Sequence, residues 1–394
     1  MSAKRWYVVG LGAAINMVAF AMGTACMPVL FKEISDKLGL DIVEIGTVWG
    51  LSSVAGIFSI LAAGFLADRF GAKRVLTIFC LMAGVFGALR GVSNSFASLA
   101  ITSLLFGLAA EAVPVIVIKN ASQWFHDKGL GTAQGIITTC VGAGMMLGAM
   151  LSATVLSPLL GGWERVMYFY GGITVLASVI WVLTVPEPPK TEPVNPVAAP
   201  SRHRTLSHVF RVRGVWFVAL AMMGFAGCNK GLMGYLPVYL RNTGWSPTAA
   251  DGALAALNAA GTVAAIPLTM LSDKINLRKA VLLPGVFTIA VSVGLLSIAS
   301  GPAVWLLAVL SGLFRDLVWA MAATITVETE DIGPLYAGTA VGIVHSFTRI
   351  GYTFAPPAGN SFALINAGLP FVFWAGLCML GFVLFLFVKE TGRK

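Results

Sequence analysis

The sequence predicts an all-α membrane protein with twelve transmembrane helices in two pseudo-symmetric six-helix bundles. Hydrophobic residues make up 57% of the 394 residues and charged residues only 11%, whereas a soluble chain has about 25% charged residues. Apolar stretches of about twenty residues, the length that crosses a bilayer, follow one another along the chain. One charged segment also occurs twice, at matching places in the two halves. A surface of this composition requires lipid around it.

Each predicted helix is an apolar stretch that ends at charged or turn-forming residues. Six lie on each side of one polar segment. The predicted spans are 6–31, 42–67, 74–91, 96–124, 130–157, 164–185, 214–240, 248–271, 279–299, 302–327, 336–361 and 367–388.

The polar segment, residues 186–213, is predicted to link two domains. It is rich in proline from Pro186 to Pro200, and proline density prevents a regular helix. The expected organisation is therefore an N-terminal bundle at 1–185, a linker at 186–213 and a C-terminal bundle at 214–394. A flexible joint would let the two halves rock against each other.

The net charge of +9 is distributed as in a membrane protein. With a cytoplasmic N-terminus, most Lys and Arg residues fall in inward loops and tails, and few, such as Lys32, Arg90 and Arg241, fall outward. This positive-inside bias predicts a multi-pass protein of the cell inner membrane or plasma membrane with both termini in the cytoplasm. The basic residues thus set topology, and we expect no nucleic-acid site.

The five cysteines all lie in predicted helices, with neither disulfide nor metal-ligand spacing. We expect no metal and no cofactor. No nucleophile–base set or phosphate-binding loop is apparent in the sequence, so an enzyme is not expected. Without an ATP-binding motif, energy should come from a gradient or from exchange.

The repeated segment occupies residues 64–74 and 269–279. Asp68 matches Asp273 and Arg69 matches Lys274 at an offset of 205 residues. At the same offset Gly107 matches Gly312, which places Glu111 and Asp316 at equivalent points of the fourth and tenth helices. Membrane proteins built from two similar halves usually move a solute between them.

The first copy resembles the loop between helices 2 and 3 that marks the major facilitator superfamily. The resemblance covers essentially the whole chain. It implies two six-helix bundles, a central cavity lined by helices 1, 4, 7 and 10, and alternating access. In that family the loop latches helices across the halves in the outward-open state, so the resemblance implies a gate here. The gating residues would be Gly64, Asp68, Arg69, Gly71, Lys73, Arg74, Asp273 and Lys274. The alternative is that the basic loop only fixes topology.

Residues 124–133 resemble the junction of helices 4 and 5 in organic-anion branches of the family, which include monocarboxylate and oxalate/formate transporters. The drug-efflux branch carries a glycine-rich pattern in helix 5. Gly135, Gly144 and Gly148 match its spacing, but Ala149 replaces its proline. This departure favours an anion carrier over a drug/proton antiporter.

Charged residues inside the predicted spans point to the solute. Each costs about 2.5–3.5 kcal/mol at mid-bilayer, so they should face a cavity or one another. Four cations against two acids leave a positive surplus that an anionic substrate would balance. These residues are Glu111, Lys119, Lys230, Arg315, Asp316 and Arg349.

We predict that Lys230 and Arg315 anchor the substrate, with Arg349 next, because arginine binds a carboxylate by two bonds. Trp319 could stack on an organic skeleton, and Asn229 and Tyr235 are weaker polar candidates. Alternatively, Glu111 with Lys119 and Arg315 with Asp316 form bridges that fix helix packing. Neighbours on a helix point about 100° apart, so at most one of Arg315 and Asp316 is expected to face the cavity directly.

Proton coupling needs a group that is neutral in one state and charged in another, and a desolvated carboxyl group suits this. Glu111 is the first candidate and Asp316 the second. Pro114 removes one backbone bond and should bend the fourth helix beside Glu111.

The sequence therefore predicts a secondary transporter, functional as a monomer, that moves a small organic anion by alternating access, with a proton or by exchange. Proton-driven efflux of a lipophilic or cationic compound is the alternative. A non-transporting sensor with a transporter-like body is a third reading.

Overall fold

The computed structural model describes residues 2–125, 129–187, 202–275, 277–329 and 331–391. Every regular element in these ranges is a helix. The chain forms two compact units. Unit 1 comprises Met1–Glu192 and Leu236–Ala255, and unit 2 comprises Pro193–Tyr235 and Ala256–Lys394.

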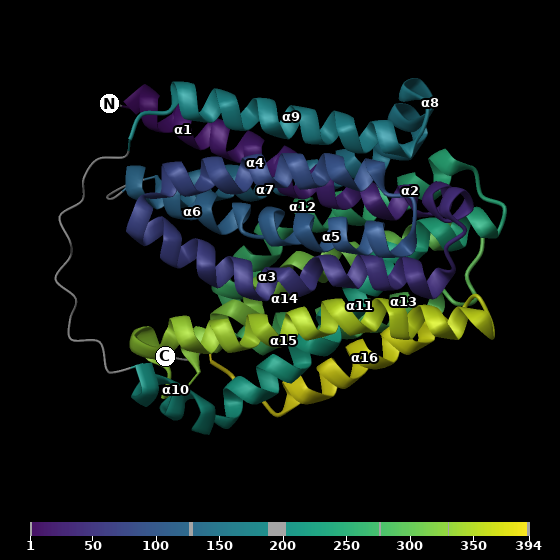
Figure 1. The fold of residues 1–394 in the computed structure, drawn as a ribbon. Helices are drawn as coiled ribbons and strands as arrows, with labels where there is room; N and C mark the ends of the chain where they lie inside the picture. Colours follow the sequence, from purple (N-terminus) through teal and green to yellow (C-terminus); the bar gives the residue numbers. More distant parts are fainter. Residues whose placement is uncertain (1, 126–128, 188–201, 276, 330, 392–394) are drawn as a thin grey trace. The chain divides into compact units, whose positions relative to one another are not determined.

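Unit 1 is built on long helices that lie side by side, with α4 against α9 and α3 against α5 (Figure 1). The first span is continuous, but a π-helical segment, η1, interrupts its α-helical bonding. The elements are α1 (Ser2–Ile15), η1 (Asn16–Met22), α2 (Gly23–Leu38), α3 (Ile42–Phe70), α4 (Ala72–Leu89), η2 (Arg90–Val92), α5 (Phe96–Ala110), α6 (Val113–Trp124), α7 (Leu130–Leu151), η3 (Ser152–Leu156), α8 (Ser157–Leu160) and α9 (Trp163–Thr184).

Unit 2 contains the later helices, with α13 packed between α14 and α16. Two helices, α11 and α12, start or end in unit 2 and supply residues 236–255 to unit 1. The elements are α10 (Arg202–Arg211), α11 (Arg213–Asn242), α12 (Pro247–Ile275), α13 (Arg278–Leu295), α14 (Pro302–Glu328), α15 (Gly333–Ser361), η4 (Phe362–Leu364) and α16 (Leu369–Leu386).

Eleven of the twelve predicted spans are confirmed. Within the described ranges, eleven helices are long and apolar enough to cross a membrane. The remaining predicted span corresponds to α15, which is 29 residues long. It is less apolar than the others because it carries His345 and Arg349. The first span runs to Leu38, beyond its predicted end at residue 31, because polar residues continue the helix until Gly39 ends it in a left-handed conformation.

One expectation about the linker was wrong. Residues 188–201 lie outside the described part of the chain, but α10 forms a regular helix at Arg202–Arg211. The prolines stop at Pro200, so nothing in the sequence after it prevents helical hydrogen bonding.

The internal repeat is visible as a repeated helix contact. In unit 1, a Cβ added to Gly107 on α5 would lie 1.9 Å from the carbonyl oxygen of Ser52 on α3. In unit 2, a Cβ on Gly312 of α14 would lie 2.1 Å from the carbonyl oxygen of Leu257 on α12. Both pairs are related by the same offset of 205 residues. Glycine is required at both places because only hydrogen fits there.

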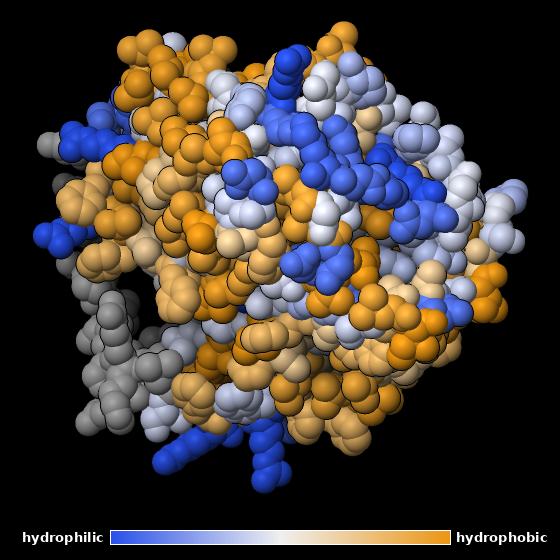
Figure 2. Space-filling view, turned by 45° about the vertical axis from the view of Figure 1, so that its right-hand side comes forward, coloured by the Kyte–Doolittle hydropathy of each residue, from blue (hydrophilic) through white to orange (hydrophobic). Residues whose placement is uncertain are grey.

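The surface suits a bilayer. Figure 2 shows broad areas of hydrophobic side chains on the visible face, with hydrophilic residues gathered in patches. Large aliphatic side chains are strongly exposed; Leu183 is 77% exposed and Ile298 80%. Water does not stabilise such a surface, so these side chains are expected to contact lipid.

A buried ion pair fastens residues 236–255 within unit 1. Asp251 on α12 is fully buried and accepts two bonds from Arg241 Nη2, at 2.6 and 2.7 Å. Thr154 Oγ1, from the π-helical η3, donates to the same carboxylate at 2.9 Å. The carboxylate thus holds together α11, α12 and η3.

Candidate functional site

The charged centre of unit 2 is an ion pair between adjacent residues on α14. Arg315 Nε donates to Asp316 Oδ1 at 2.8 Å, and Arg315 Nη2 donates to Asp316 Oδ2 at 3.2 Å. Arg315 Nη1 donates to Oδ1 of the fully buried Asn258 at 2.7 Å. The alternative in which Arg315 and Asp316 form a bridge is therefore what the structure contains. Their 100° separation on the helix does not prevent it, because the long arginine side chain curls back to its neighbour.

A glycine on α12 makes room for this pair. A Cβ added to Gly261 would lie 2.9 Å from Asp316 Oδ2 and 3.1 Å from Arg315 Nη2. Gly261 lies nearly one helical turn after Asn258, so the same face of α12 supplies both the amide and the space. The geometry of the ion pair is thus set by α12 as well as by α14.

Two further cations flank one aromatic ring. Lys230 Nζ on α11 lies 5.6 Å from the ring centroid of Tyr352 on α15, and the guanidinium carbon of Arg349 lies 5.7 Å from it. These are cation–π distances. Two helices thus bring Lys230, Arg349 and Tyr352 together in unit 2; we call these three residues the cation–tyrosine cluster.

Aromatic side chains extend this cluster. Trp319 on α14 lies 6.2 Å from Tyr352 and is stacked on His345 at 6.1 Å, centroid to centroid. Phe225 on α11 also contacts Trp319, at 6.0 Å. Trp319 and His345 line a cavity of about 20 Å³, the size of one water molecule.

The residues of the site differ in their exposure to solvent. Lys230, Arg315 and Asn229 are buried, whereas Arg349, Tyr352 and Trp319 are half-buried and His345 is exposed. The side chain of Asp316 is 31% exposed although its partner's is 10% exposed. The carboxylate and the aromatic rings are therefore more accessible than Lys230 and Arg315.

Tyr235 lies elsewhere. Its hydroxyl donates to the carbonyl oxygen of Ala367 at 2.9 Å, and its ring packs edge-on against Phe371 and Trp374. These contacts explain its burial through packing, and the structure does not bring it to the cation–tyrosine cluster.

The intramembrane charges of unit 1 are arranged differently. Helices α5 and α6 are interrupted at Glu111–Ala112, and Pro114 lies in the first turn of α6. The sequence predicts a bend beside Glu111, and the helical hydrogen bonding is interrupted there. Glu111 is half-buried, and Lys119 Nζ donates to the carbonyl oxygen of Gly64 at 2.9 Å. Lys119 therefore ties α6 to the helix that carries the charged loop.

Arg90 is buried, which its position in a predicted outer loop did not indicate. It is 2% exposed, its Nη2 donates to the carbonyl oxygen of Gly23 at 3.0 Å, and its guanidinium lies 3.8 Å from the ring centroid of Phe106. The short η2 helix turns it inward. Carbonyl groups and an aromatic face stabilise the charge here.

The charged loop turns at a glycine. Gly71 has φ of 89°, a conformation that favours glycine, and it separates α3 from α4. Arg69 lies over the ring of Phe70 at 5.3 Å, Lys274 is exposed, and the carbonyl oxygen of Lys73 accepts a bond from Trp181 Nε1. The side chains of Asp68 and Asp273 lie outside the described part of the structure.

The basic ends of both copies contact acids that the motif itself does not contain. In unit 1 Arg74 Nε lies 3.7 Å from Glu187, with both side chains exposed. In unit 2 the backbone nitrogen atoms of Arg278 and Lys279 donate to Glu390, which caps α13.

The comparison with known families decides the identity of this fold. The model described as Major Facilitator Superfamily matches residues 12–329 and, in a second overlapping match, residues 240–394. The chain belongs to the Major Facilitator Superfamily. Its long apolar helices are those expected of a multi-pass membrane protein of this superfamily.

Individual relatives of this superfamily member are distant. The chain is 29% identical over 208 residues to the probable galactarate/D-glucarate transporter GudP of Escherichia coli; the match covers 49% of this chain and 44% of that protein, less than half of its length. It is 22% identical to the 3-(3-hydroxy-phenyl)propionate transporter of Escherichia coli over 91% of this chain and 88% of that protein.

A solved structure confirms the superfamily fold. The structure of a bacterial homolog of the human lysosomal transporter Spinster, inward-facing and unoccupied, covers 98% of this chain and 95% of its own, with a TM-score of 0.77 and 17% identity.

Sequence reasoning missed two residues of the unit 2 site. Tyr352 lies three residues after Arg349 and seven after His345, so helical spacing alone places the three on one face of α15. Asn258 carried no comparable signal, because a single amide in an apolar helix gives no indication of its partner.

Proposed function

We propose that this transporter moves a small organic anion, a carboxylate, and that the anion binds against the cation–tyrosine cluster of unit 2. The observation that carries the proposal is the convergence of Lys230 and Arg349 on the ring of Tyr352. The intramembrane charges of unit 2 are Lys230, Arg315 and Arg349 against Asp316, a formal surplus of two positive charges. A carboxylate supplies the missing negative charge.

The chemistry of the cluster supports an organic rather than an inorganic anion. A carboxylate would contact the ammonium or guanidinium group while its carbon skeleton lies against Tyr352 and Trp319. Because Lys230 is shielded from water, a charge-assisted bond to it would contribute about 1.5–3 kcal/mol. Asn229, buried beside Lys230, would donate or accept one further hydrogen bond.

The named relatives agree with this chemistry. Galactarate and D-glucarate are dicarboxylates, and 3-(3-hydroxy-phenyl)propionate is an aromatic carboxylate. We infer a carboxylate for this chain without choosing between a sugar acid and an aromatic acid.

The role of Arg315 in anion binding differs from that of Lys230 and Arg349. Its charge is balanced by Asp316, so an anion would compete with Asp316 for it. Protonation of Asp316 removes this competition and frees Arg315 to bind the anion. Proton and anion then bind cooperatively, and lower pH on the uptake side tightens anion binding. Glu111, at the equivalent position of unit 1, is the second candidate for proton coupling.

We further propose that residues 1–185 and 214–394 act as the two halves of an alternating-access cycle, joined by 186–213. The gate would be formed by Gly64, Asp68, Arg69, Gly71, Lys73, Arg74, Asp273 and Lys274. The basic loops favour an inner-membrane protein with both termini cytoplasmic.

Counterflow in proteoliposomes tests the proposal. Vesicles preloaded with unlabelled sugar acids, aromatic acids or short monocarboxylates would be given the labelled compound, beside an organic cation and an uncharged nucleoside. At least one carboxylate should exchange. Lys230→Gln should reduce its exchange, and Lys230→Arg should retain part of it. Lys32→Gln, which removes a lysine paired with Asp36 outside the cluster, should not change it. Exchange of the cation alone would refute the proposal and favour efflux.

A further inference from the structure

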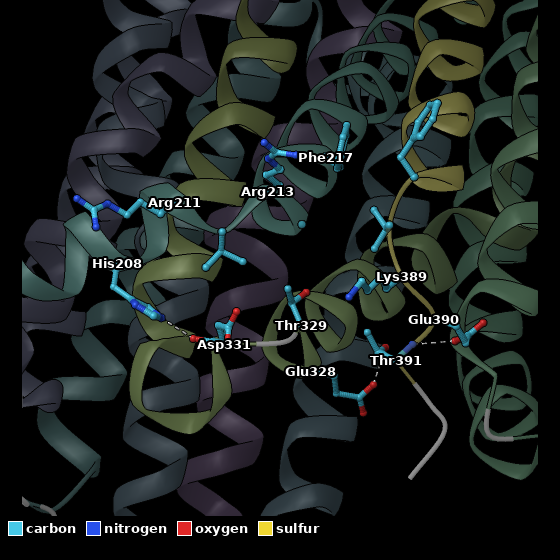
Figure 3. Close-up of a pocket in the computed structure, with 14 residues that line it drawn as sticks. His208, Arg211, Arg213, Phe217, Glu328, Thr329, Asp331, Lys389, Glu390 and Thr391 are labelled. Carbon is cyan, nitrogen blue, oxygen red and sulfur yellow. Dashed lines mark hydrogen bonds between the residues drawn. The ribbon is translucent and has the colours of Figure 1, made fainter.

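A second cavity, unrelated to the site above, opens at one end of unit 2. Its volume is about 700 Å³, and it lies where α10, the start of α11 and the ends of α14 and α16 meet (Figure 3). Charged and apolar residues both line it, among them Arg211, Arg213, Phe217, Phe387 and Lys389.

Two of the acids in its wall are already bound to neighbouring groups. Glu328 Oε1 accepts a bond from Arg278 Nη2 at 3.3 Å, and Glu328 Oε2 accepts one from Thr391 Oγ1 at 2.9 Å. Glu390 accepts the backbone N–H groups of Arg278 and Lys279. These donors hold both carboxylates in place, and Arg278 balances the charge of Glu328.

The cations of the wall are more accessible. The side chains of Arg211, Arg213 and Lys389 are exposed. His208 is fixed in the wall, because its Nε2 lies 2.7 Å from the carbonyl oxygen of Asp331 and its ring is stacked on Tyr336. Three accessible cationic side chains thus lie beside a fixed imidazole in the wall, which also contains the acids Glu328, Asp331 and Glu390.

An apolar surface adjoins these cations. The rings of Phe217 and Phe387 are stacked at 5.7 Å, and Phe387 is 64% exposed. Phe210 on α10 is exposed as well. A ligand that has both an anionic head and apolar tails would match the cations and the rings together.

We propose that this cavity binds the phosphate headgroup of an anionic phospholipid, with its acyl chains over Phe387. Basic residues next to a membrane-spanning helix attract anionic lipids by about 1 kcal/mol each, which corresponds to about a fivefold change in affinity. The lipid would bridge α10 and the ends of α11 and α16, and so hold the helix that follows the linker against unit 2.

Lipid binding to the full chain in detergent tests the proposal. Phosphatidylglycerol, phosphatidylcholine and soluble glycerol phosphate would be titrated while native mass spectrometry records the bound lipid. Phosphatidylglycerol should bind more tightly than phosphatidylcholine, and Arg213→Gln should weaken it about fivefold. Lys4→Gln, which removes an exposed basic residue of unit 1, is the control with the same change of charge.

Three results would overturn the proposal. Equal binding of the two lipids would show that the head charge is not recognised. Equal weakening by Lys4→Gln and Arg213→Gln would indicate general surface attraction. Glycerol phosphate that binds as tightly as phosphatidylglycerol would make the ligand a soluble phosphate. Thermal unfolding of each variant without lipid separates loss of binding from loss of folding.

Discussion

Arg315 and Asp316 are neighbours in the chain and partners in space, joined by two hydrogen bonds of 2.8 and 3.2 Å within α14. This ion pair changes the sequence-based prediction that Arg315 is one of the main substrate anchors. Asp316 balances the charge of Arg315, so we assign the proposed binding of the anion to Lys230 and Arg349. The pair also offers a place where protonation and anion binding could be linked.

The first prediction concerns this link. In Asp316→Asn the competitor for Arg315 is permanently neutral, as if protonated. We expect anion affinity in this variant to be at least as high as in the wild type and to depend less on pH than that of the wild type, because the proton linkage through this carboxyl group is lost. Isothermal titration at several pH values measures it.

Transport should follow the same logic. A pH gradient should drive accumulation by the wild type and not by Asp316→Asn, whereas exchange continues in both. Undiminished accumulation in Asp316→Asn would remove Asp316 from the coupling, and the same experiment with Glu111→Gln would then test the other candidate.

The second prediction concerns Gly261. Alanine there would bring a Cβ to 2.9 Å from Asp316 Oδ2 and from the carbonyl oxygen of Gly312. We expect Gly261→Ala to displace the ion pair and to lower both thermal stability and transport. Crowding of this kind typically costs about 1–3 kcal/mol.

Gly376→Ala is the matched control, because nothing lies within 4 Å of the added Cβ. Helix propensity alone should stabilise it by up to about 1 kcal/mol. If both variants unfolded at the same temperature as the wild type, the proposed role of Gly261 in spacing α12 from α14 would be wrong.

The third prediction separates the ring of Tyr352 from its hydroxyl group. Tyr352→Phe keeps the aromatic ring that Lys230 and Arg349 flank, so substrate KM should change little. Tyr352→Leu removes it and should raise KM by about 2- to 30-fold, the equivalent of about 0.5–2 kcal/mol. A large effect of Tyr352→Phe would instead assign the contribution to the hydroxyl group.

The fourth prediction concerns the ion pair of unit 1. Asp251→Ala leaves Arg241 without its carboxylate in a buried place, which typically costs about 3–5 kcal/mol. Thr154→Val removes one neutral donor and should cost about 1 kcal/mol. Thermal unfolding of the purified variants should therefore rank Asp251→Ala well below Thr154→Val. The reverse order would mean that Arg241 finds another partner.

Much of the fold follows from the sequence, since hydropathy alone locates spans that need about twenty apolar residues. The internal repeat could also be predicted from the sequence, because Gly107 and Gly312 are separated by the same 205 residues as the charged segments. Each glycine permits a close helix contact. The interaction partners of the charged side chains could not be predicted from the sequence. Helix numbering assigns Arg315 to a helix, but whether its side chain turns to Asp316 or away depends on Gly261 and Asn258 of another helix. Arg90 likewise is buried by the local turn of η2, which hydropathy does not register.

The central claim, that Lys230 and Arg349 hold the negative charge of the substrate beside Tyr352, is tested most directly by one comparison of affinities. The dissociation constants of the carboxylate that exchanges best and of its uncharged carboxamide would be measured for the wild type, Lys230→Gln and Lys32→Gln. The account predicts that the wild type and Lys32→Gln prefer the carboxylate by at least about tenfold, about 1.4 kcal/mol, and that Lys230→Gln loses most of this preference. Equal affinity of the wild type for the acid and the amide would contradict it.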